Sequence, residues 1–98
     1  MILSLNEGNF AAETANKTVL VDFWAPWCGP CHAMSPIMSD ISQDFDVAKV
    51  NIDENTELAS RHNVSAIPTF IIFKNGSETK RFVGIQKKAV LEDAIKGA

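Results

Sequence analysis

One segment constrains the fold more than any other part of this sequence: residues 18–24, which read Thr-Val-Leu-Val-Asp-Phe-Trp. Apart from Asp22, its residues are β-branched, aromatic or apolar at both alternating sets of positions. Such residues favour strands, and a strand that is apolar on both faces is typically buried between two layers of helices. The segment therefore predicts a layered α/β domain with this strand at the centre of its sheet.

Helices and strands are expected to alternate around this central strand. Before it, an apolar stretch over residues 2–5 precedes a helix over residues 7–15, which Asn6 can cap. After it, a helix is expected to begin at Cys31 and to kink at Pro36, because proline removes a backbone hydrogen bond from a helix interior. The apolar stripe of this helix, which is expected to pack in the core, consists of Met34, Ile37, Met38, Ile41 and Phe45.

The second half of the chain continues the alternation and then adds a hairpin. Asn75-Gly76 is a dipeptide that strongly favours a two-residue hairpin turn. The expected order is β-α-β-α-β-α-β-β-α, and parallel crossovers followed by an antiparallel hairpin predict a mixed sheet. The expected strands cover residues 47–52, 69–73 and 78–83. A short helix is expected to follow a cap at Asp53 or Asn55 and to end near His62, and the last helix is expected over residues 87–96.

Size and composition limit what the chain can be. Its 98 residues, 46% of them hydrophobic, are expected to form one domain over residues 1–98. A net charge of -3 argues against a nucleic-acid partner, which calls for a basic face. The sequence has neither the run of about 18 apolar residues that a membrane span needs nor, in its first residues, a signal peptide. We therefore expect a cytoplasmic monomer with no membrane partner.

The two cysteines, Cys28 and Cys31, are separated by two residues. A bridge between them closes a very small loop, which restrains the unfolded chain too little for a structural role. Such a pair in an intracellular protein is usually redox-active or metal-binding. A zinc site would need two further ligands, and the two histidines, His32 and His62, do not have the usual spacing. A redox dithiol without a bound metal is therefore the favoured interpretation, and a zinc half-site is the alternative.

The place of the two cysteines in the predicted fold suggests different roles for them. Cys28 lies at the start of a helix, where unpaired N–H groups and the positive end of the helix dipole favour a thiolate. Its loop position is expected to expose its sulfur, whereas Cys31, one turn further on, is expected to face inward. We therefore expect Cys28 to attack a substrate disulfide and Cys31 to resolve the mixed disulfide.

Asp22 is the charged residue of the central strand, where it shares a face with Leu20 and Trp24. A carboxylate at such a position is costly unless it is paired or protonated. The functional interpretation is that Asp22 accepts the proton of Cys31. The alternative is that it is a structural partner of Lys49 on the neighbouring strand, and both can hold at once.

Five segments resemble the thioredoxin family. The stretch Val-Asp-Phe-Trp-Ala-Pro-Trp-Cys-Gly-Pro-Cys over residues 21–31 is similar to the active-site segment of that family almost letter for letter. Four more segments match in order and spacing: Asn51-Ile52-Asp53, Ile67-Pro68-Thr69, Phe73-Lys74-Asn75-Gly76 and Val83-Gly84. The resemblance implies the thioredoxin fold, a central mixed five-stranded sheet flanked by four helices. It also implies a general protein disulfide reductase that binds no cofactor and receives electrons from NADPH through thioredoxin reductase.

The resemblance further implies which residues surround the dithiol. It makes the peptide bond before Pro68 cis and turns this proline toward the dithiol. The residues expected to contact substrate are Trp27, Gly29, Pro30, Ile67, Pro68, Gly84 and Ile85. The residues expected to support the site are Trp24, Lys49 and Pro36.

The sequence departs from the family pattern at three places. His32 stands where the family usually has Lys or Arg, and we expect it to be merely solvated. Ile85 stands where Ala is usual, and it is either packed at a strand end or part of an apolar rim around the dithiol. The segment over residues 45–47 is shorter than in bacterial members.

Two other functions stay open at this point. The first is an oxidase or isomerase, but the resemblance associates Gly29-Pro30 with reducing members and a histidine in the second position with isomerases and oxidants. That histidine would favour the thiolate and raise the potential, whereas Pro30 carries no charge. The second is a binding module that uses the apolar rim of the fold as a scaffold.

Overall fold

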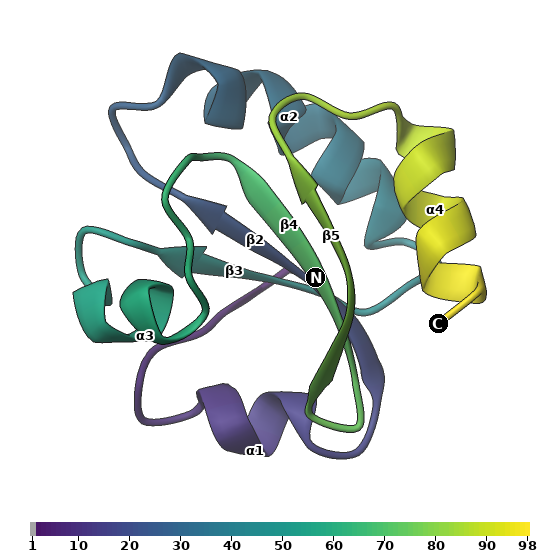
Figure 1. Cartoon of the computed structure of the whole chain (residues 1–98). Coiled ribbons are helices and arrows are strands. Elements are labelled where there is room, and N and C mark those ends of the chain that lie inside the picture. The colour runs from purple at the N-terminus through teal and green to yellow at the C-terminus, as the bar shows by residue number, and fades with distance from the viewer. Residues whose placement is uncertain (1) are drawn as a thin grey trace.

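The computed structural model of the protein describes residues 2–98 and contains one mixed sheet with helices on both faces (Figure 1). In chain order its elements are β1 (Leu3–Ser4), α1 (Phe10–Thr14), β2 (Thr18–Trp24), α2 (Gly29–Ile41), β3 (Val47–Asn51), α3 (Thr56–Arg61), β4 (Thr69–Lys74), β5 (Ser77–Val83) and α4 (Lys88–Lys96). The five strands lie in the order β1-β3-β2-β4-β5. β3 pairs in parallel with β1 and β2, and β4 is antiparallel to both β2 and β5. The predicted class and element order are confirmed.

β2 lies at the centre of the sheet, as its composition predicted. Its residues from Val19 to Phe23 are buried, with β3 on one side and β4 on the other. Asp22 lies opposite Lys49 of β3 and Phe70 of β4. A carboxyl group therefore occupies the middle of the sheet, next to the point where β2 leads into the cysteine loop.

The sheet separates two hydrophobic cores because the side chains of β2 alternate between its faces. Phe23 packs on the face that α1 and α3 cover, whereas Leu20 packs on the face that α2 and α4 cover (Figure 1). Met34 and Met38 of α2 are buried in the second core, as predicted. Asp22 is on the same side of β2 as Leu20, and it therefore lies beneath α2.

Helix α2 begins at Gly29, so the prediction that it begins at Cys31 is wrong by two residues. Cys28 itself is the N-cap, with an extended backbone at φ -90° and ψ 108°. Proline suits the first turn of a helix, where its missing N–H has no partner to lose, and Pro30 therefore falls inside the helix. The helix continues through Pro36 to Ile41, and the kink at Pro36 stays a prediction.

The first helix is also shorter than predicted, beginning at Phe10. The side chain of Asn6 accepts hydrogen bonds from the N–H groups of Gly8 and Asn9, at 2.8 and 3.0 Å, and so stabilises a turn before the helix. The N–H of Phe10 donates to the carbonyl of Asn6 at 3.0 Å, so Asn6 caps this turn with its side chain, and the regular helix begins at Phe10.

Helix α3 is capped from another part of the chain. The side chain of Asn55, its N-cap residue, makes no capping bond but accepts from the N–H of Glu7 at 3.3 Å. The Glu7 carboxylate in turn accepts from the N–H of Leu58 at 3.3 Å, and it thereby satisfies a donor in the first turn of α3.

The hairpin between β4 and β5 turns at Asn75-Gly76, as predicted. Both residues have positive φ, 52° for Asn75 and 83° for Gly76, which is the conformation that a type I′ turn requires. The remaining predicted ends of strands and helices in this half of the chain agree with the structure to within one or two residues. Among residues 2–98, no helix has both the length and the apolar character to span a membrane.

Candidate active site

The cysteine pair lies at the N-terminus of α2, where the central strand leads into the helix. A disulfide joins Cys28 to Cys31, whose Cα atoms are 5.3 Å apart. The N–H of Cys31 donates to the Sγ atom of Cys28 at 3.2 Å, and the N–H of Cys28 donates to the carbonyl of Ala25 at 3.1 Å. The sulfur of Cys28 therefore receives a backbone donor at the positive end of the helix dipole, an arrangement that stabilises a thiolate when the bond is reduced.

The two cysteines are almost equally buried. Cys28 is 4% exposed and Cys31 is 3% exposed, so the expectation of an exposed Cys28 is wrong for the disulfide form. The disulfide packs both residues into a small apolar cluster with Ala25, against which Ile67 also lies. Trp27, Gly29 and Pro30, which flank Cys28 in the chain, are exposed, so the buried disulfide lies next to an exposed stretch of the chain.

Asp22 is buried close to this dithiol and is 8% exposed. Its Oδ1 atom has no hydrogen-bond partner among residues 2–98. Burial raises the pKa of Asp22 from 3.8 to about 7, although the positive charge of Lys49 lowers it. A cleft of about 140 Å³, wide enough to admit water, is lined by Asp22, Trp24, Cys31, His32, Ser35 and Lys49. The structure therefore brings Asp22 and Cys31 to one small opening.

Lys49 does not form an ion pair with Asp22. Within the described part of the chain, the ion pairs closer than 4.0 Å join Lys17 to Glu13 and Arg81 to Glu78. The Nζ atom of Lys49 instead lies 4.9 Å from the centre of the Trp24 ring, a cation–π contact. The structural alternative for Asp22 is therefore not supported by a direct bond, and Lys49 acts on the carboxyl group through its charge alone.

Trp27 is held by a residue that the sequence interpretation missed. The indole N–H of Trp27, a residue that is 69% exposed, donates to both carboxylate oxygens of Asp53, at 3.0 and 3.3 Å. In the sequence, Asp53 is a possible helix cap and part of the family-like segment Asn51-Ile52-Asp53, and neither signal gives it a role at the site. A topological signal is present, however, since the carboxyl ends of parallel neighbours such as β2 and β3 meet at one edge of the sheet.

A second loop packs against the dithiol at Ile67. The Ile67–Pro68 peptide bond is cis, as the family resemblance implied. Ile67 contacts the cysteine cluster, and the carbonyl of Pro68 accepts from the N–H of Gly84 at 2.8 Å. Gly84 has φ of 88°, which a side chain would strain. Next to it, Ile85 is 63% exposed, so it does not pack at the end of the strand.

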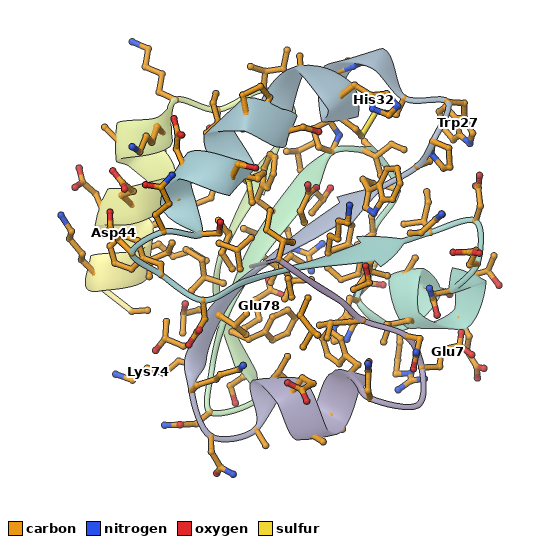
Figure 2. The ribbon with its side chains drawn as sticks, turned by 180° about the vertical axis from the view of Figure 1, so that it is seen from behind. Glu7, Trp27, His32, Asp44, Lys74 and Glu78 are labelled. Atoms are coloured by element: carbon orange, nitrogen blue, oxygen red, sulfur yellow. A yellow bond between two sulfur atoms is a disulfide. The ribbon has the colours of Figure 1, made fainter. Side chains whose placement is uncertain are left out.

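His32 is exposed, but the expectation that it is merely solvated is wrong. Its Nε2 atom lies 2.7 Å from the carbonyl oxygen of Pro26. Figure 2 shows His32 and Trp27 at the same edge of the molecule as the disulfide. Residues 2–98 contain no group of three or more His, Cys, Asp or Glu side chains that could hold a metal ion, so the second ligand pair of a zinc site is not found there.

The two cysteines form a disulfide at the N-terminus of a helix that follows the central strand of an α/β sheet, and Cys28 is the N-cap of that helix. This arrangement defines the class of thiol–disulfide oxidoreductases. The chain belongs to the thioredoxin family, because the thioredoxin family model matches residues 1–97. It is 36% identical to thioredoxin of Bacillus subtilis over 98 residues, or 96% of this chain and 94% of the relative. It is 43% identical to thioredoxin of Alicyclobacillus acidocaldarius over 95 residues, or 92% of this chain and 90% of the relative.

Solved structures agree with this assignment. A mutant thioredoxin from Halobacterium salinarum superposes with a TM-score of 0.90 at 33% identity, covering 97% of this chain and 88% of that one. Reduced thioredoxin pre-protein of Schistosoma mansoni superposes with a TM-score of 0.86 at 37% identity, covering 98% and 96%. The protein is therefore a disulfide reductase that works by dithiol–disulfide exchange, and its redox group is its own Cys28–Cys31 disulfide. Its partners are proteins with disulfides and a reductase that regenerates the dithiol.

Proposed function

We propose that Cys28 is the nucleophile and Cys31 the resolving cysteine of a general protein disulfide reductase. The Cys28 thiolate attacks one sulfur of a substrate disulfide, forms a mixed disulfide and releases the first substrate thiolate. The Cys31 thiolate then attacks the sulfur of Cys28, closes the internal disulfide and releases the second substrate thiolate. Two electrons pass from the dithiol to the substrate, and the substrate thiolates take up protons.

The observation that carries this assignment is the position of Cys28 as the N-cap of α2, with the N–H of Cys31 directed at its sulfur at 3.2 Å. A hydrogen bond to a charged acceptor is roughly twice as strong as one to a neutral acceptor. This donor therefore stabilises the Cys28 thiolate more than the thiol. Cys31 lies in the interior of the first turn and shares its cleft with Asp22, which suits the second step.

Asp22 is proposed to take the proton of Cys31 during that second step, directly or through water in the cleft. A general base is most effective when its pKa is close to the working pH. The burial that raises the pKa of Asp22 to about 7 supports this role. Lys49 and Trp24, which line the same cleft, are proposed to support the site. Pro36 is a further proposed supporting residue, although it is exposed in α2 and does not line this cleft.

The proposed docking surface surrounds the disulfide. Trp27 and Ile85 are large apolar side chains that stay exposed, at 69% and 63%, and such exposed apolar groups are typical of interaction sites. Gly29 faces open space, because a β-carbon added at that position would have no atom within 4 Å. The other residues proposed to contact an extended substrate segment are Pro30, Ile67, Pro68 and Gly84.

The proposal extends to the partners and the state of the protein. We propose that an NADPH-dependent thioredoxin reductase regenerates the dithiol and that the protein acts as a cytoplasmic monomer with a single domain over residues 1–98. The Gly29-Pro30 dipeptide supports the reducing direction, because no charged group stands between the cysteines to stabilise the thiolate further.

Trapping tests the assignment of roles. Reduced Cys31→Ser is expected to accumulate a stable mixed disulfide with a disulfide-containing protein such as insulin, because it has a nucleophile but no resolving thiol. The matched variant Cys28→Ser is expected to trap none, and limiting iodoacetamide should label Cys28 of the reduced protein first. Trapping by Cys28→Ser together with faster labelling of Cys31 would reverse the two roles.

A further inference from the structure

His32 bridges the loop that presents Trp27. Its backbone N–H donates to the carbonyl of Cys28 at 3.3 Å, while its ring nitrogen Nε2 lies 2.7 Å from the carbonyl of Pro26. These two carbonyls are on either side of Trp27 in the chain. The loop is closed beneath them by the bond from the N–H of Cys28 to the carbonyl of Ala25, at 3.1 Å. One residue of α2 therefore holds both backbone segments that flank Trp27.

The chemistry of this contact defines which ring nitrogen carries a proton. A backbone carbonyl can only accept, so Nε2 of His32 must be the donor. The neutral ring is then the Nε2–H tautomer, with Nδ1 as its free acceptor. The partner of Nε2 assigns this tautomer, and a spectroscopic measurement can detect it.

The ring of His32 is itself held in place by packing. It meets the ring of Trp24 edge-on, with centroids 6.3 Å apart and planes at 74°. It also forms one wall of the cleft that leads to Asp22 and Cys31. The imidazole therefore has a packed side against Trp24 and a hydrogen-bonded end at Pro26, which limits the rotamers that it can adopt.

We propose that His32 is a positioning residue for substrate docking: its Nε2–H bond to the carbonyl of Pro26 holds the loop on which Trp27 is presented. The indole of Trp27 is fixed by Asp53 at 3.0 Å, and the His32 ring fixes the backbone before Trp27 at the carbonyl of Pro26. The carbonyl of Cys28, after Trp27, accepts from the main-chain N–H of His32. This inference rests on the proposed docking surface. A macromolecular substrate contacts that surface, whereas a small disulfide needs only the sulfur of Cys28.

Three variants separate the hydrogen bond from the ring. In His32→Gln the amide nitrogen stands at the same number of bonds from the backbone as Nε2 and can donate to Pro26. In His32→Asn the amide nitrogen is one bond shorter, at the place of Nδ1. His32→Phe keeps a ring against Trp24 but has no donor. The readout is the ratio of kcat/KM for a protein disulfide, insulin, to kcat/KM for a small aromatic disulfide, which does not depend on the fraction of folded protein.

We expect the ratio to fall about fivefold in His32→Phe and in His32→Asn, the effect of one net hydrogen bond, and to return toward the wild-type value in His32→Gln. Nitrogen-15 spectra of the wild-type imidazole should show the Nε2–H tautomer. Any one of four results would overturn the inference. The ratio could stay at the wild-type value in His32→Phe, or it could be no higher in His32→Gln than in His32→Asn. The value of kcat/KM could also fall equally for both substrates, or the spectra could show the Nδ1–H tautomer.

Trp27→Ala distinguishes failure of this inference from failure of the proposed docking surface. If Trp27 contacts protein substrates, the ratio falls in Trp27→Ala as well. A ratio that falls in Trp27→Ala but not in His32→Phe overturns the role of His32 alone. A ratio that Trp27→Ala leaves at the wild-type value overturns the docking surface, and the role of His32 with it.

Discussion

Replacing Asp22 with Asn is expected to stabilise the protein and, at the same time, to slow its reaction. Asp22 is 8% exposed, and its Oδ1 atom has no hydrogen-bond partner among residues 2–98. Desolvation disfavours the charged form, which is why the pKa rises from 3.8 to about 7. A raised carboxyl pKa means that the folded protein prefers the protonated group. The stability that Asp22 contributes in its protonated form is fully present below pH 3.8, and it is lost as the pH rises toward 7.

The size of the effect follows from this shift. A rise from 3.8 to about 7 is roughly three pKa units, which corresponds to about 4 kcal/mol lost once the group is ionised in both states. Near pH 5 the group is protonated in the folded protein but mostly ionised in the unfolded chain, so only about 2 kcal/mol of this has been lost. Asp22→Asn does not titrate, so its advantage over the wild type should grow by about 2 to 3 kcal/mol between about pH 5 and pH 8.

Urea unfolding of the oxidised protein at these two pH values measures the difference in the free energy of unfolding. Asp44→Asn is a matched control, because Asp44 is an exposed aspartate away from the dithiol (Figure 2). It should change stability by less than about 0.5 kcal/mol at either pH. Release of substrate from the mixed disulfide should slow in Asp22→Asn near neutral pH, because Cys31 loses its proton acceptor. If Asp22→Asn is less stable than the wild type at both pH values, Asp22 is a structural group and the reasoning fails.

Three further predictions concern other parts of the molecule. His62 lies against three phenylalanine rings, and burial followed by neighbouring arginines lowers its pKa below 6.5. The contribution of His62 to stability is therefore lost as the pH falls through 6.5, and the urea midpoint of His62→Gln should rise relative to that of the wild type over this range. Gly76 has φ of 83° with open space around it, so Gly76→Ala should lower the free energy of unfolding by about 1 to 2 kcal/mol through backbone strain alone, and an unchanged midpoint would contradict this. Asp53→Ala removes the acceptor of the Trp27 indole and should lower kcat/KM for insulin by about twofold to fivefold, whereas Asp53→Asn keeps an oxygen there and should lose less.

The parts of the fold that the sequence predicted are those with regular hydrophobic patterns or distinctive turn residues. β2 matched its predicted bounds because both of its faces are apolar, and the turn at Asn75-Gly76 followed from two residues that tolerate positive φ. The start of α1 was missed because the turn that Asn6 caps, over residues 7–9, is not part of the regular helix, which begins at Phe10. Local sequence patterns do not decide whether such a capped turn has regular helical geometry.

The site was predictable only where its chemistry lies within one segment. The pairing of Cys28 with Cys31 and the burial of Asp22 follow from spacing and from the central strand. The bond between Trp27 and Asp53 joins residues that are 26 positions apart, and it depends on how two loops meet beyond the ends of the strands. The equal burial of the two cysteines could not be read from their positions either, because it depends on the disulfide and on the packing of distant Ile67.

The reduction potential of the Cys28–Cys31 pair tests the central claim most directly. Equilibration of the protein with a dithiothreitol redox series, followed by tryptophan fluorescence, gives this potential, and Cys31→Ser should show no transition. A reductase should lie near the value of about -270 mV that is general for thioredoxins, a family figure rather than one worked from this structure. A potential of about -180 mV or higher would contradict the account. A difference of about 90 mV changes the equilibrium constant for reduction of the disulfide about a thousandfold in favour of the dithiol, which is typical of an isomerase or an oxidant.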